Sequence, residues 1–191
     1  MPRASAADAA LTAEQVLDAA TALFAAGGFA SVSLDDVARA AGVTRGAVYH
    51  HYRSKPGLFR AVAARLQTQV AAAVVATADR EAGAVEQLRS GSHAFLDAIT
   101  AAPAVRILLI DAPSVIGWEE WRRLDAENSG AQLREALRDA GAPAELIEAM
   151  AAQLSGAMND AALWIAQHDT PAAAREQAHA ALDRLIAAAM A

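Results

Sequence analysis

Apolar residues recur at every third or fourth position along most of this chain, which is the spacing of an amphipathic α-helix. The first such pattern begins at Thr12, where Thr-Ala-Glu-Gln matches a capping box, and it ends at the Gly27-Gly28 pair. Ser33 then caps a second, short helix that reaches Ala41. The apolar face of the first predicted helix consists of Val16, Leu17, Ala20, Leu23 and Phe24.

The remaining pattern predicts helices as far as the C-terminus. Ser54 caps a long helix that extends to Ala78, and no proline-rich or Gly/Ser-rich linker separates the two halves of the chain, so we expect a rigid connection. The apolar run at 105–110 can be a buried strand by composition, but no second strand is available to pair with it, and we predict a helix there. Further helices are predicted at 85–101, 118–140, 144–167 and 171–189.

The segment 31–59, SVSLDDVARAAGVTRGAVYHHYRSKPGLF, has the spacing of two short helices joined by a turn and followed by the start of a third. Gly42 falls at the turn, where a residue without a Cβ adopts the left-handed conformation most easily. Thr44 can then cap the next helix through its hydroxyl. This pattern is typical of a helix-turn-helix, whose second helix lies in the major groove of DNA. Its inward positions are Val37, Ala38, Ala41, Val43 and Val48.

Residues 11–59, LTAEQVLDAATALFAAGGFASVSLDDVARAAGVTRGAVYHHYRSKPGLF, resemble the DNA-binding domain of the tetracycline-repressor (TetR) family of transcriptional regulators. They make up about a quarter of the chain. The resemblance depends on an ordered combination: a helix ending in Gly-Gly-Phe, then DDVARAAGV, then YHHY, then SK before a hydrophobic pair. One departure is Pro56-Gly57, where the family usually has two helix-forming residues. Proline is tolerated in a first helical turn, whereas glycine costs about 1 kcal/mol relative to alanine inside a helix.

The resemblance implies an all-α protein with an N-terminal three-helix helix-turn-helix DNA-binding domain at 11–55. A long helix would join it to a C-terminal helical ligand-binding and dimerisation domain at 56–191, and we expect 1–10 to be a disordered N-terminal lead. The implied function is that of a homodimeric transcriptional repressor. It would bind an inverted-repeat operator in double-stranded DNA and be released from it by a small hydrophobic effector.

The residues after the predicted turn have suitable chemistry for contacting DNA. Arg45 can pair with a guanine edge or a phosphate, and Gly46 lets the backbone approach the DNA closely. The hydroxyl of Tyr49 and the imidazole of His50 can reach phosphate oxygens one turn later. Alternatively, Tyr49 packs inside the domain, as we expect for Tyr52, and Arg45 is a solvated charge. The resemblance implies DNA contacts at Ser33, Thr44, Arg45, Gly46, Tyr49, His50 and Lys55.

Composition narrows the classes of protein that the chain can belong to. The absence of cysteine excludes a disulfide framework, thiol catalysis and Cys-ligated zinc. We find neither a signal peptide nor a charge-free run of about 18 apolar residues, so we expect a cytoplasmic protein without a membrane span. No cofactor is expected, and His93, His168 and Asp111 lack the close spacing of a metal site. Common catalytic motifs are missing, which argues against an enzyme.

The charge of the chain is distributed unevenly between its two parts. The formal net charge is −6, which by itself argues against a nucleic-acid partner. However, residues 1–65 contain seven basic and five acidic residues, a net of +2, whereas residues 66–191 contain nine basic and seventeen acidic residues, a net of −8. Local basic residues, rather than the whole-chain charge, determine affinity for phosphates.

The last two predicted helices each carry a stripe of small and apolar residues. Such stripes permit close helix packing, either in a four-helix interface between two protomers or in the core of one protomer. The resemblance favours the homodimer, which also fits a two-fold symmetric operator. The stripes are Ile147, Met150, Leu154, Ala157, Ala161 and Ile165, and Ala174, Ala178, Ala181, Leu182, Leu185 and Ala189.

A ligand cavity is expected among the remaining helices, since the resemblance implies a small-molecule effector. All three tryptophans lie in this part of the chain, and apolar and aromatic side chains are the usual lining of such cavities. Ordinary core packing is the alternative role for each aromatic residue. A cavity this apolar would suit a hydrophobic or aromatic ligand of low charge. The candidate residues are Ser92, Phe95, Ile110, Asp111, Trp118, Trp121, Met158, Asn159 and Trp164.

A second hypothesis is a helical protein that binds or sequesters small molecules and retains a vestigial helix-turn-helix. Its support in the sequence is the Pro56-Gly57 departure, while Arg45, Tyr49 and Lys55 argue against it. A third hypothesis, a helical enzyme, would require a catalytic set of residues that the sequence does not show.

Overall fold

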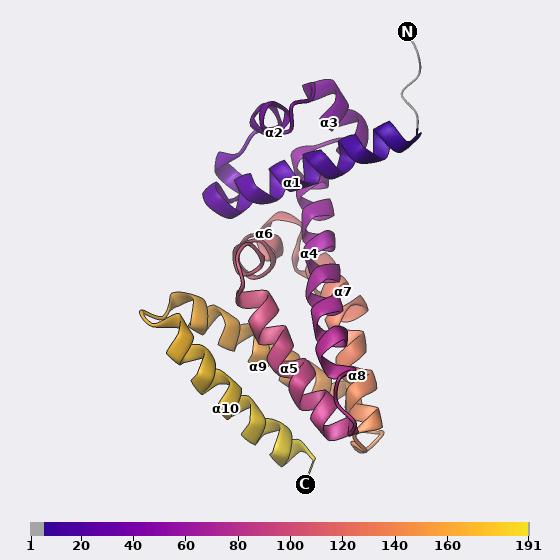
Figure 1. Ribbon diagram of the computed structural model, residues 1–191, viewed down its shortest axis with the longest axis vertical. Coiled ribbons are helices and arrows are strands. Elements are labelled where there is room, and N and C mark those ends of the chain that lie inside the picture. Colours follow the sequence, from indigo (N-terminus) through magenta and orange to yellow (C-terminus); the bar gives the residue numbers. More distant parts are fainter. Residues whose placement is uncertain (1–5, 191) are drawn as a thin grey trace.

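The computed structural model describes residues 6–190, and within this range every regular element is helical (Figure 1). The prediction of an all-α fold is therefore confirmed. In chain order the elements are α1 (Ala6–Ser31), α2 (Leu34–Ala40), α3 (Arg45–Tyr52), α4 (Lys55–Ala78), α5 (Ala84–Thr100), η1 (Val105–Asp111), α6 (Ala112–Val115), α7 (Trp118–Glu127), α8 (Ser129–Asp139), α9 (Ile147–Gln167) and α10 (Pro171–Ala189).

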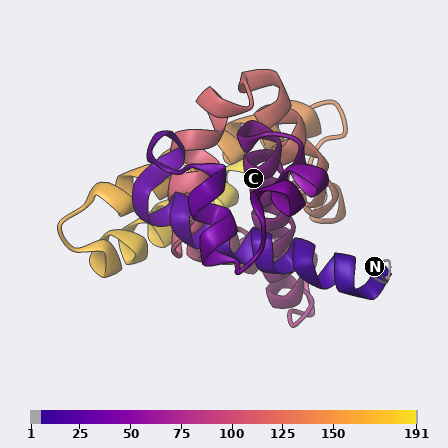
Figure 2. The same cartoon turned by 90° about the horizontal axis from the view of Figure 1, so that it is seen from above.

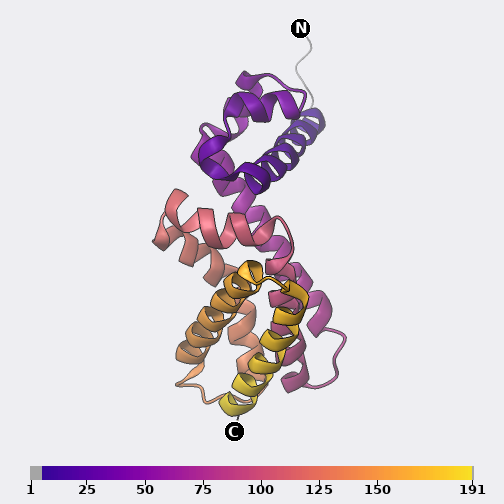
Figure 3. The ribbon, with the colours of Figure 1, turned by 90° about the vertical axis from the view of Figure 1, so that its left-hand side faces the viewer.

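Two groups of helices lie at opposite ends of the molecule and share one long helix. The helices α1, α2 and α3 gather at one end, and α4 runs from them into the larger group formed by α5 and α7 to α10 (Figure 1). From the side, α9 and α10 form an antiparallel pair on the outer surface of the larger group (Figure 3). Seen from above, α1 extends beyond α2 and α3 towards the N-terminus (Figure 2).

The helix α1 begins earlier than its sequence pattern predicted. It starts at Ala6, and the Thr12 hydroxyl donates a hydrogen bond to the Asp8 carbonyl oxygen (2.8 Å), so Thr12 lies inside the helix and does not cap it. The alanine-rich composition of 6–10 explains the extension, because alanine has the highest helix propensity. Of the predicted disordered lead, 6–10 is thus helical, and 1–5 lies outside the described residues. At Gly28, where the sequence predicted the helix to end, the backbone leaves the helical conformation (φ 76°), but α1 resumes after this kink and continues to Ser31.

The caps of α2 and α3 follow the sequence closely. Ser33 and Asp36 form a reciprocal capping box at the start of α2, and the Thr44 hydroxyl accepts a hydrogen bond from the Ala47 N–H (3.1 Å) at the start of α3. Between them Gly42 has φ 68°, and Val43 N–H donates to the Ala38 carbonyl oxygen (3.0 Å). This is a Schellman motif, so Gly42 supplies the left-handed residue that turns the chain into α3.

The start of α4 explains the unusual Pro56-Gly57 pair. Ser54 caps the helix by accepting a hydrogen bond from the Gly57 N–H (3.0 Å), and Pro56 lies in the first turn, where its missing N–H would be unpaired anyway. A Cβ at residue 57 would collide with the Tyr52 carbonyl oxygen at the end of α3. Glycine at this position therefore lets the end of α3 pack closely on the beginning of α4.

Three phenylalanines form the centre of the small N-terminal core. The rings of Phe24 and Phe59 meet edge to face with centroids 5.2 Å apart, and those of Phe29 and Phe59 with centroids 5.3 Å apart. Phe59 belongs to α4, and further along the same helix Leu66 and Val70 are buried in the core of the larger group. The helix that connects the two groups therefore contributes to one hydrophobic core that runs through both of them.

Two predicted helices of the C-terminal part have different boundaries in the structure. The helix predicted at 118–140 is interrupted at Asn128 (φ −107°, ψ −105°), whose side-chain amide donates to the Leu124 carbonyl oxygen (2.7 Å) and replaces a backbone partner. It consequently forms two helices, α7 and α8. The helix predicted from residue 144 begins at Ile147, because the chain after Pro143 first makes a turn.

The apolar run at 105–110 is helical, as predicted, but its hydrogen bonds have the wider π-helical spacing of η1. Its Ile107, Leu108 and Leu109 side chains are buried. Among residues 6–190, α4 is long and apolar enough, by length and composition alone, to cross a membrane. The helix α5 together with η1 and α6 also has the required length and composition, but only as a span that is sharply bent in the middle. This is weak evidence for a span, because core helices of soluble proteins have the same properties.

We predict opposite effects on stability for alanine at two glycines in first helical turns. Gly57→Ala places a Cβ against the Tyr52 carbonyl oxygen and is expected to lower the free energy of unfolding by about 1–3 kcal/mol. In Gly46→Ala, in the first turn of α3, the added Cβ meets nothing closer than 3.8 Å. This substitution is expected to raise the free energy of unfolding by up to about 1 kcal/mol. Urea unfolding followed by circular dichroism measures both. Equal stability of the two variants would contradict the close approach at Gly57.

Candidate nucleic-acid interface and internal cavity

The outer face of α3 is open to solvent, whereas its inner face is packed. Val48 is buried in the small core, while Thr44, Arg45, Gly46 and His50 are exposed. A helix of two turns with one packed face and one free face has the dimensions to enter a major groove. The structure thus brings four residues of the predicted DNA-binding set to one surface.

Tyr49 and Tyr52 of α3 point in different directions. The Tyr49 side chain belongs to the exposed face and is 57% exposed. The Tyr52 hydroxyl instead donates a hydrogen bond to the Ala13 carbonyl oxygen (2.8 Å) on α1, and burial raises the pKa of its phenol. The prediction that Tyr52 packs inside the domain is confirmed. The alternative in which Tyr49 packs there is wrong.

Arg45 has an acidic neighbour that the sequence pattern did not reveal. Its Nη1 lies 3.0 Å from Asp35 Oδ2, in the first turn of α2, and both side chains are mostly exposed. The next carboxylate, Asp36, accepts a side-chain and a backbone hydrogen bond from Ser33, and these lower its pKa. The neighbouring Arg39 lowers the pKa of Asp36 further, but less strongly. In the free protein the guanidinium of Arg45 is therefore partly neutralised and oriented by α2.

Ser33 and Lys55, the two predicted DNA-contacting residues outside 44–50, both have protein partners. Ser33 is the cap of α2, and its hydroxyl also lies 2.6 Å from Asp36 Oδ2. The Lys55 ammonium donates to the Ala30 carbonyl oxygen (3.2 Å) and lies 4.3 Å from the centroid of the Phe29 ring. The charge of Lys55 is thus held at the junction of α1 and α4, beside α3.

One carboxylate fastens the small helical group to the larger one. Asp111 Oδ2, at the end of η1, accepts a hydrogen bond from the Phe29 N–H (3.0 Å) and lies 3.8 Å from Arg106 Nε. The Arg106 guanidinium packs directly against Gly28, where any Cβ would collide with it. A second bridge joins Arg60 of α4 to Glu120 of α7 (3.5 Å). Asp111 therefore has a role in joining the two groups.

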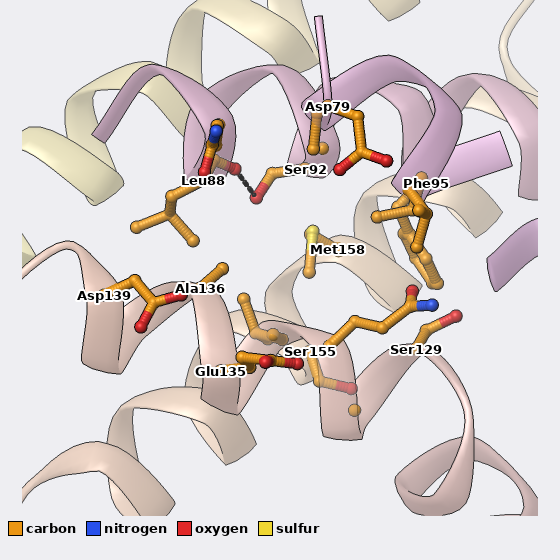
Figure 4. Close-up of a pocket in the computed structure, with 18 of the residues that line it drawn as sticks. Asp79, Leu88, Ser92, Phe95, Ser129, Glu135, Ala136, Asp139, Ser155 and Met158 are labelled. Atoms are coloured by element: carbon orange, nitrogen blue, oxygen red, sulfur yellow. Dashed lines mark hydrogen bonds between the residues drawn. The ribbon is translucent and has the colours of Figure 1, made fainter. Parts of the chain in front are cut away.

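A cavity lies between α4, α5, α8 and α9, with an edge from α7 (Figure 4). It contains about 840 Å³ of empty space, counting the part open to solvent. Ser92, Phe95 and Met158 line it, as the sequence predicted for a cavity. The Ser92 hydroxyl donates to the Leu88 carbonyl oxygen (2.7 Å), so it is satisfied within its own helix.

The other six predicted cavity residues lie elsewhere, so the prediction of one site formed by all nine is not met. Trp121 is buried and donates through its indole N–H to the Leu108 carbonyl oxygen (2.7 Å), and the exposed Trp118 stacks against it with centroids 4.8 Å apart. Asn159 is buried outside the cavity lining. The remaining three are Asp111 at the junction described above and the exposed side chains Ile110 and Trp164.

The sequence pattern did not identify the acidic and amide side chains of the cavity. Asp125, Ser129, Gln132 and Asp139 all line it. They recur at intervals of four, three and seven residues, which places them on one face across the α7–α8 break. This polar stripe is a signal of the site in the sequence, but it does not distinguish a cavity lining from a solvated helix face. Periodicity alone indicates solvated helix faces for the carboxylates of this region.

A second hollow lies on the outer surface between α9 and α10. Trp164 and Leu185 line it and remain 43% and 49% exposed, together with the exposed Ala157 and Ala181. Six other residues of the predicted stripes are buried inside the protomer and belong to its own core. For these six, the alternative that the sequence left open, packing within one protomer, is the one found. These six are Ile147, Leu154, Ile165, Ala174, Ala178 and Leu182.

No group of three or more His, Asp or Glu side chains in residues 6–190 is arranged to hold a metal ion. His93 instead pairs with Asp183 of α10 (2.7 Å) and stacks on His179 with ring centroids 4.2 Å apart. Burial, together with the neighbouring His93, lowers the pKa of His179. These contacts fasten α10 to α5.

We predict that Asp111→Ala loosens the connection between the two helical groups. The substitution leaves the part-buried Phe29 N–H without its acceptor, which is expected to cost about 1–3 kcal/mol in the free energy of unfolding. Chemical denaturation measures the loss. Asp169→Ala is the control, since this exposed carboxylate makes no hydrogen bond or ion pair among the described residues. Equal stability of the two variants would show that the Asp111 contact is energetically neutral.

Comparison with known proteins places both parts of the chain in one family. The family model for bacterial regulatory proteins of the tetR family matches residues 16–62, and the model for the tetracyclin repressor-like C-terminal domain matches 85–189. The HTH-type transcriptional regulator SrpR of Pseudomonas putida is 46% identical over 67 residues, 35% of this chain and 32% of that protein. The HTH-type transcriptional repressor Rv1474c of Mycobacterium tuberculosis is 31% identical over 120 residues, 63% of each chain. The chain thus spans between a third and two thirds of the length of these two relatives.

Solved structures match over almost the whole chain. A TetR-family transcriptional regulator from Pectobacterium atrosepticum is 28% identical and has a TM-score of 0.76, with 97% of each chain covered. A TetR-family regulator from Streptomyces coelicolor, at 21% identity, shares the fold with a TM-score of 0.77 over 95% of this chain and 97% of its own. Because the C-terminal family model alone matches more than half of the sequence, this chain belongs to the TetR family of transcriptional regulators.

Proposed function

We propose that this chain is a homodimeric repressor that binds an inverted-repeat operator in double-stranded DNA and leaves it when a small molecule enters the cavity. The regulators of this family are DNA-binding repressors. The observation that carries the proposal for this chain is the free outer face of α3. There Arg45, Gly46, Tyr49 and His50 lie together on a helix whose inner face and both ends are fixed. No enzymatic activity is part of the proposal.

In this proposal the residues of α3 have distinct roles. Arg45 reads a guanine edge or contacts a phosphate, and Gly46 lets the helix backbone approach the DNA. The Tyr49 hydroxyl and the His50 imidazole contact phosphate oxygens, which position the helix without specifying sequence. Ser33, Thr44 and Lys55 add contacts at the edges of this surface, and the helix dipoles of α2 and α4 support them.

The helix α4 provides a direct route between DNA and ligand. Its first turn holds Lys55 beside α3, while Val74, Val75 and Ala78 near its other end line the cavity. A ligand that prefers one position of α4 would therefore favour one spacing of two DNA-binding heads. A coupling of about 1–3 kcal/mol between the two sites is enough to change occupancy of an operator substantially.

The alternative function is a small-molecule binding protein with a vestigial helix-turn-helix. Its support was the Pro56-Gly57 pair, and the structure accommodates both residues without disturbing α3. Retention of an exposed, capped helix with Arg45 and Tyr49 on its surface favours the repressor.

We predict that Arg45→Ala and Tyr49→Ala each weaken binding to the operator by at least about tenfold, as expected for loss of a base or phosphate contact. The measurement is fluorescence anisotropy with the DNA upstream of the chain's own gene, over a salt series and with unrelated DNA for comparison. Arg80→Ala is the control, because this exposed arginine follows α4 at the end remote from α3. Asp35→Asn is expected to strengthen binding to both DNAs, since it removes a negative charge and frees Arg45.

Unchanged affinity in the Arg45 and Tyr49 variants would reject the α3 surface as the DNA-binding site. If the unsubstituted chain does not distinguish its upstream DNA from unrelated DNA at any salt concentration, the binding protein with a vestigial helix-turn-helix becomes the better description.

The homodimer is proposed to form through α9 and α10, where Trp164 and Leu185 are exposed on the outer surface. We predict that Leu185→Glu converts a dimer into a monomer, because two carboxylates would be buried near the two-fold axis. Light scattering after size-exclusion chromatography measures the mass. Leu11→Glu, an exposed leucine of α1, is the matched control. A dimer that persists in Leu185→Glu would place the interface on another face.

A further inference from the structure

The cavity combines an apolar interior with an acidic lining. Leu88, Phe95 and Leu133 are buried side chains of its wall, and Met158 lies near its centre (Figure 4). Its lining also includes Asp79, Asp125, Glu135 and Asp139, and no lysine, arginine or histidine of the described residues belongs to it. Four carboxylates without a lining cation are an unusual environment for a neutral or anionic ligand.

These carboxylates occupy two levels of the cavity. Asp79, Glu135 and Asp139 are exposed, from the end of α4 and the outer turns of α8, so they surround the mouth. Asp125, from α7, is only 5% exposed and lies in the interior. A ligand that enters would therefore pass three exposed carboxylates before it reaches a buried one.

Two further polar atoms of the same cavity lining have no hydrogen-bond partner among the described residues. The Ser129 side chain is 9% exposed, and its hydroxyl is buried without a hydrogen-bond partner within 6–190, as is Gln132 Oε1. Ser155 donates one hydrogen bond to Asp125 Oδ2 (3.2 Å). Buried polar atoms are nearly always hydrogen-bonded, so an unpaired hydroxyl and an unpaired amide oxygen in a cavity indicate the place of a ligand donor.

The arginines nearest to Asp125 are engaged outside the cavity. Arg134 donates to the Ala126 carbonyl oxygen (2.8 Å) and lies 3.8 Å from Glu148, and Arg122 lies over the Trp118 ring. Burial raises the pKa of Asp125, and this effect outweighs the opposing influence of the Ser155 hydrogen bond and of the two arginines. The carboxylate of Asp125 is thus left without full compensation inside the protein.

We infer that the cavity binds an organic cation: an apolar, aromatic or aliphatic body whose protonated amine pairs with Asp125 and donates to Ser129 and Gln132. The three carboxylates at the mouth attract the cation, and the apolar wall packs on its body. This inference rests on the proposed function, because it names the ligand class of the same cavity. It also replaces the expectation of a ligand of low charge, which rested on the apolar and aromatic candidate residues.

The test uses three probes with one body and three charges: 4-phenylbenzylamine, 4-phenylbenzyl alcohol and 4-phenylbenzoate. Isothermal titration calorimetry of the full chain without DNA at pH 7.5 is expected to show the amine binding at least about tenfold more tightly than the alcohol, and the benzoate most weakly. Asp125→Asn should weaken binding of the amine by about tenfold or more and change that of the alcohol less than about threefold. Asp169→Asn, a carboxylate remote from the cavity lining, is the control.

The same variant has a second, ligand-free readout. Because the pKa of Asp125 is higher in the folded chain than in the unfolded chain, ionisation of this carboxyl disfavours folding. That penalty is absent below the unfolded pKa near 3.8 and is fully present above the raised folded pKa. Asp125→Asn should therefore have a higher Tm than the unsubstituted chain at pH 7.5. This gain in Tm should disappear once the pH falls below the pKa that the Asp125 carboxyl has in the unfolded chain.

Each outcome decides for or against the inference. A preference for the amine that Asp125→Asn removes, in a variant with a raised Tm, supports it. Equal binding of amine and alcohol, tightest binding of the benzoate, an unaffected Asp125→Asn variant, or no binding of any probe overturns it. The proposed repressor function fails separately, in the anisotropy measurement with DNA. An amine that binds without changing DNA affinity would leave the cation site standing and reject ligand-controlled release.

Discussion

The structure depends on one helix, α4, that contributes along its length to the continuous hydrophobic core of both helical groups. Near its start, Phe59 meets Phe24 and Phe29 of α1, and further along Leu66 and Val70 are buried in the same continuous core. Protein interiors are packed almost as densely as organic crystals, so a shift of such a helix cannot be absorbed at one end alone. Asp111 adds a polar connection beside this helix, since it joins the end of α1 to η1. The recognition surface and the cavity are therefore parts of one mechanical unit.

Local chemistry determined the parts of the molecule that the sequence predicted well. Ser33, Gly42, Thr44 and Ser54 define helix ends through short-range hydrogen bonds and backbone conformation, and each is found in its predicted role. The boundaries that were predicted wrongly have local causes as well. Asn128 breaks a helix by hydrogen bonding to its own turn, which hydrophobic periodicity cannot reveal. The candidate DNA-contacting residues could be selected because most of them lie at or directly after these helix ends.

The cavity could not be predicted in the same way, because its lining comes from helices that are distant in the sequence. Whether Asp125 is a solvated carboxylate or a buried one depends on how α7 and α8 pack against α5 and α9. The aromatic residues misled the prediction, since Trp121 is used to pack η1 and Trp118 remains largely exposed. A buried carboxylate and an unpaired hydroxyl make the protein less stable than an apolar core would, and such local costs are common at binding sites.

The ion pair between Arg45 and Asp35 has a consequence for how such a protein searches a genome. Most DNA that it meets is not its operator, and attraction to any phosphate backbone would keep copies of the protein on irrelevant sequence. In the proposed complex with DNA, a carboxylate 3.0 Å from the Arg45 guanidinium would reduce that general attraction, because Arg45 already has a partner in the free protein. An acceptor in the DNA would have to compete with Asp35 for the arginine. Under the proposed function, Asp35 would thereby increase the ratio of specific to non-specific occupancy, so that fewer copies per cell would be needed to keep one operator filled.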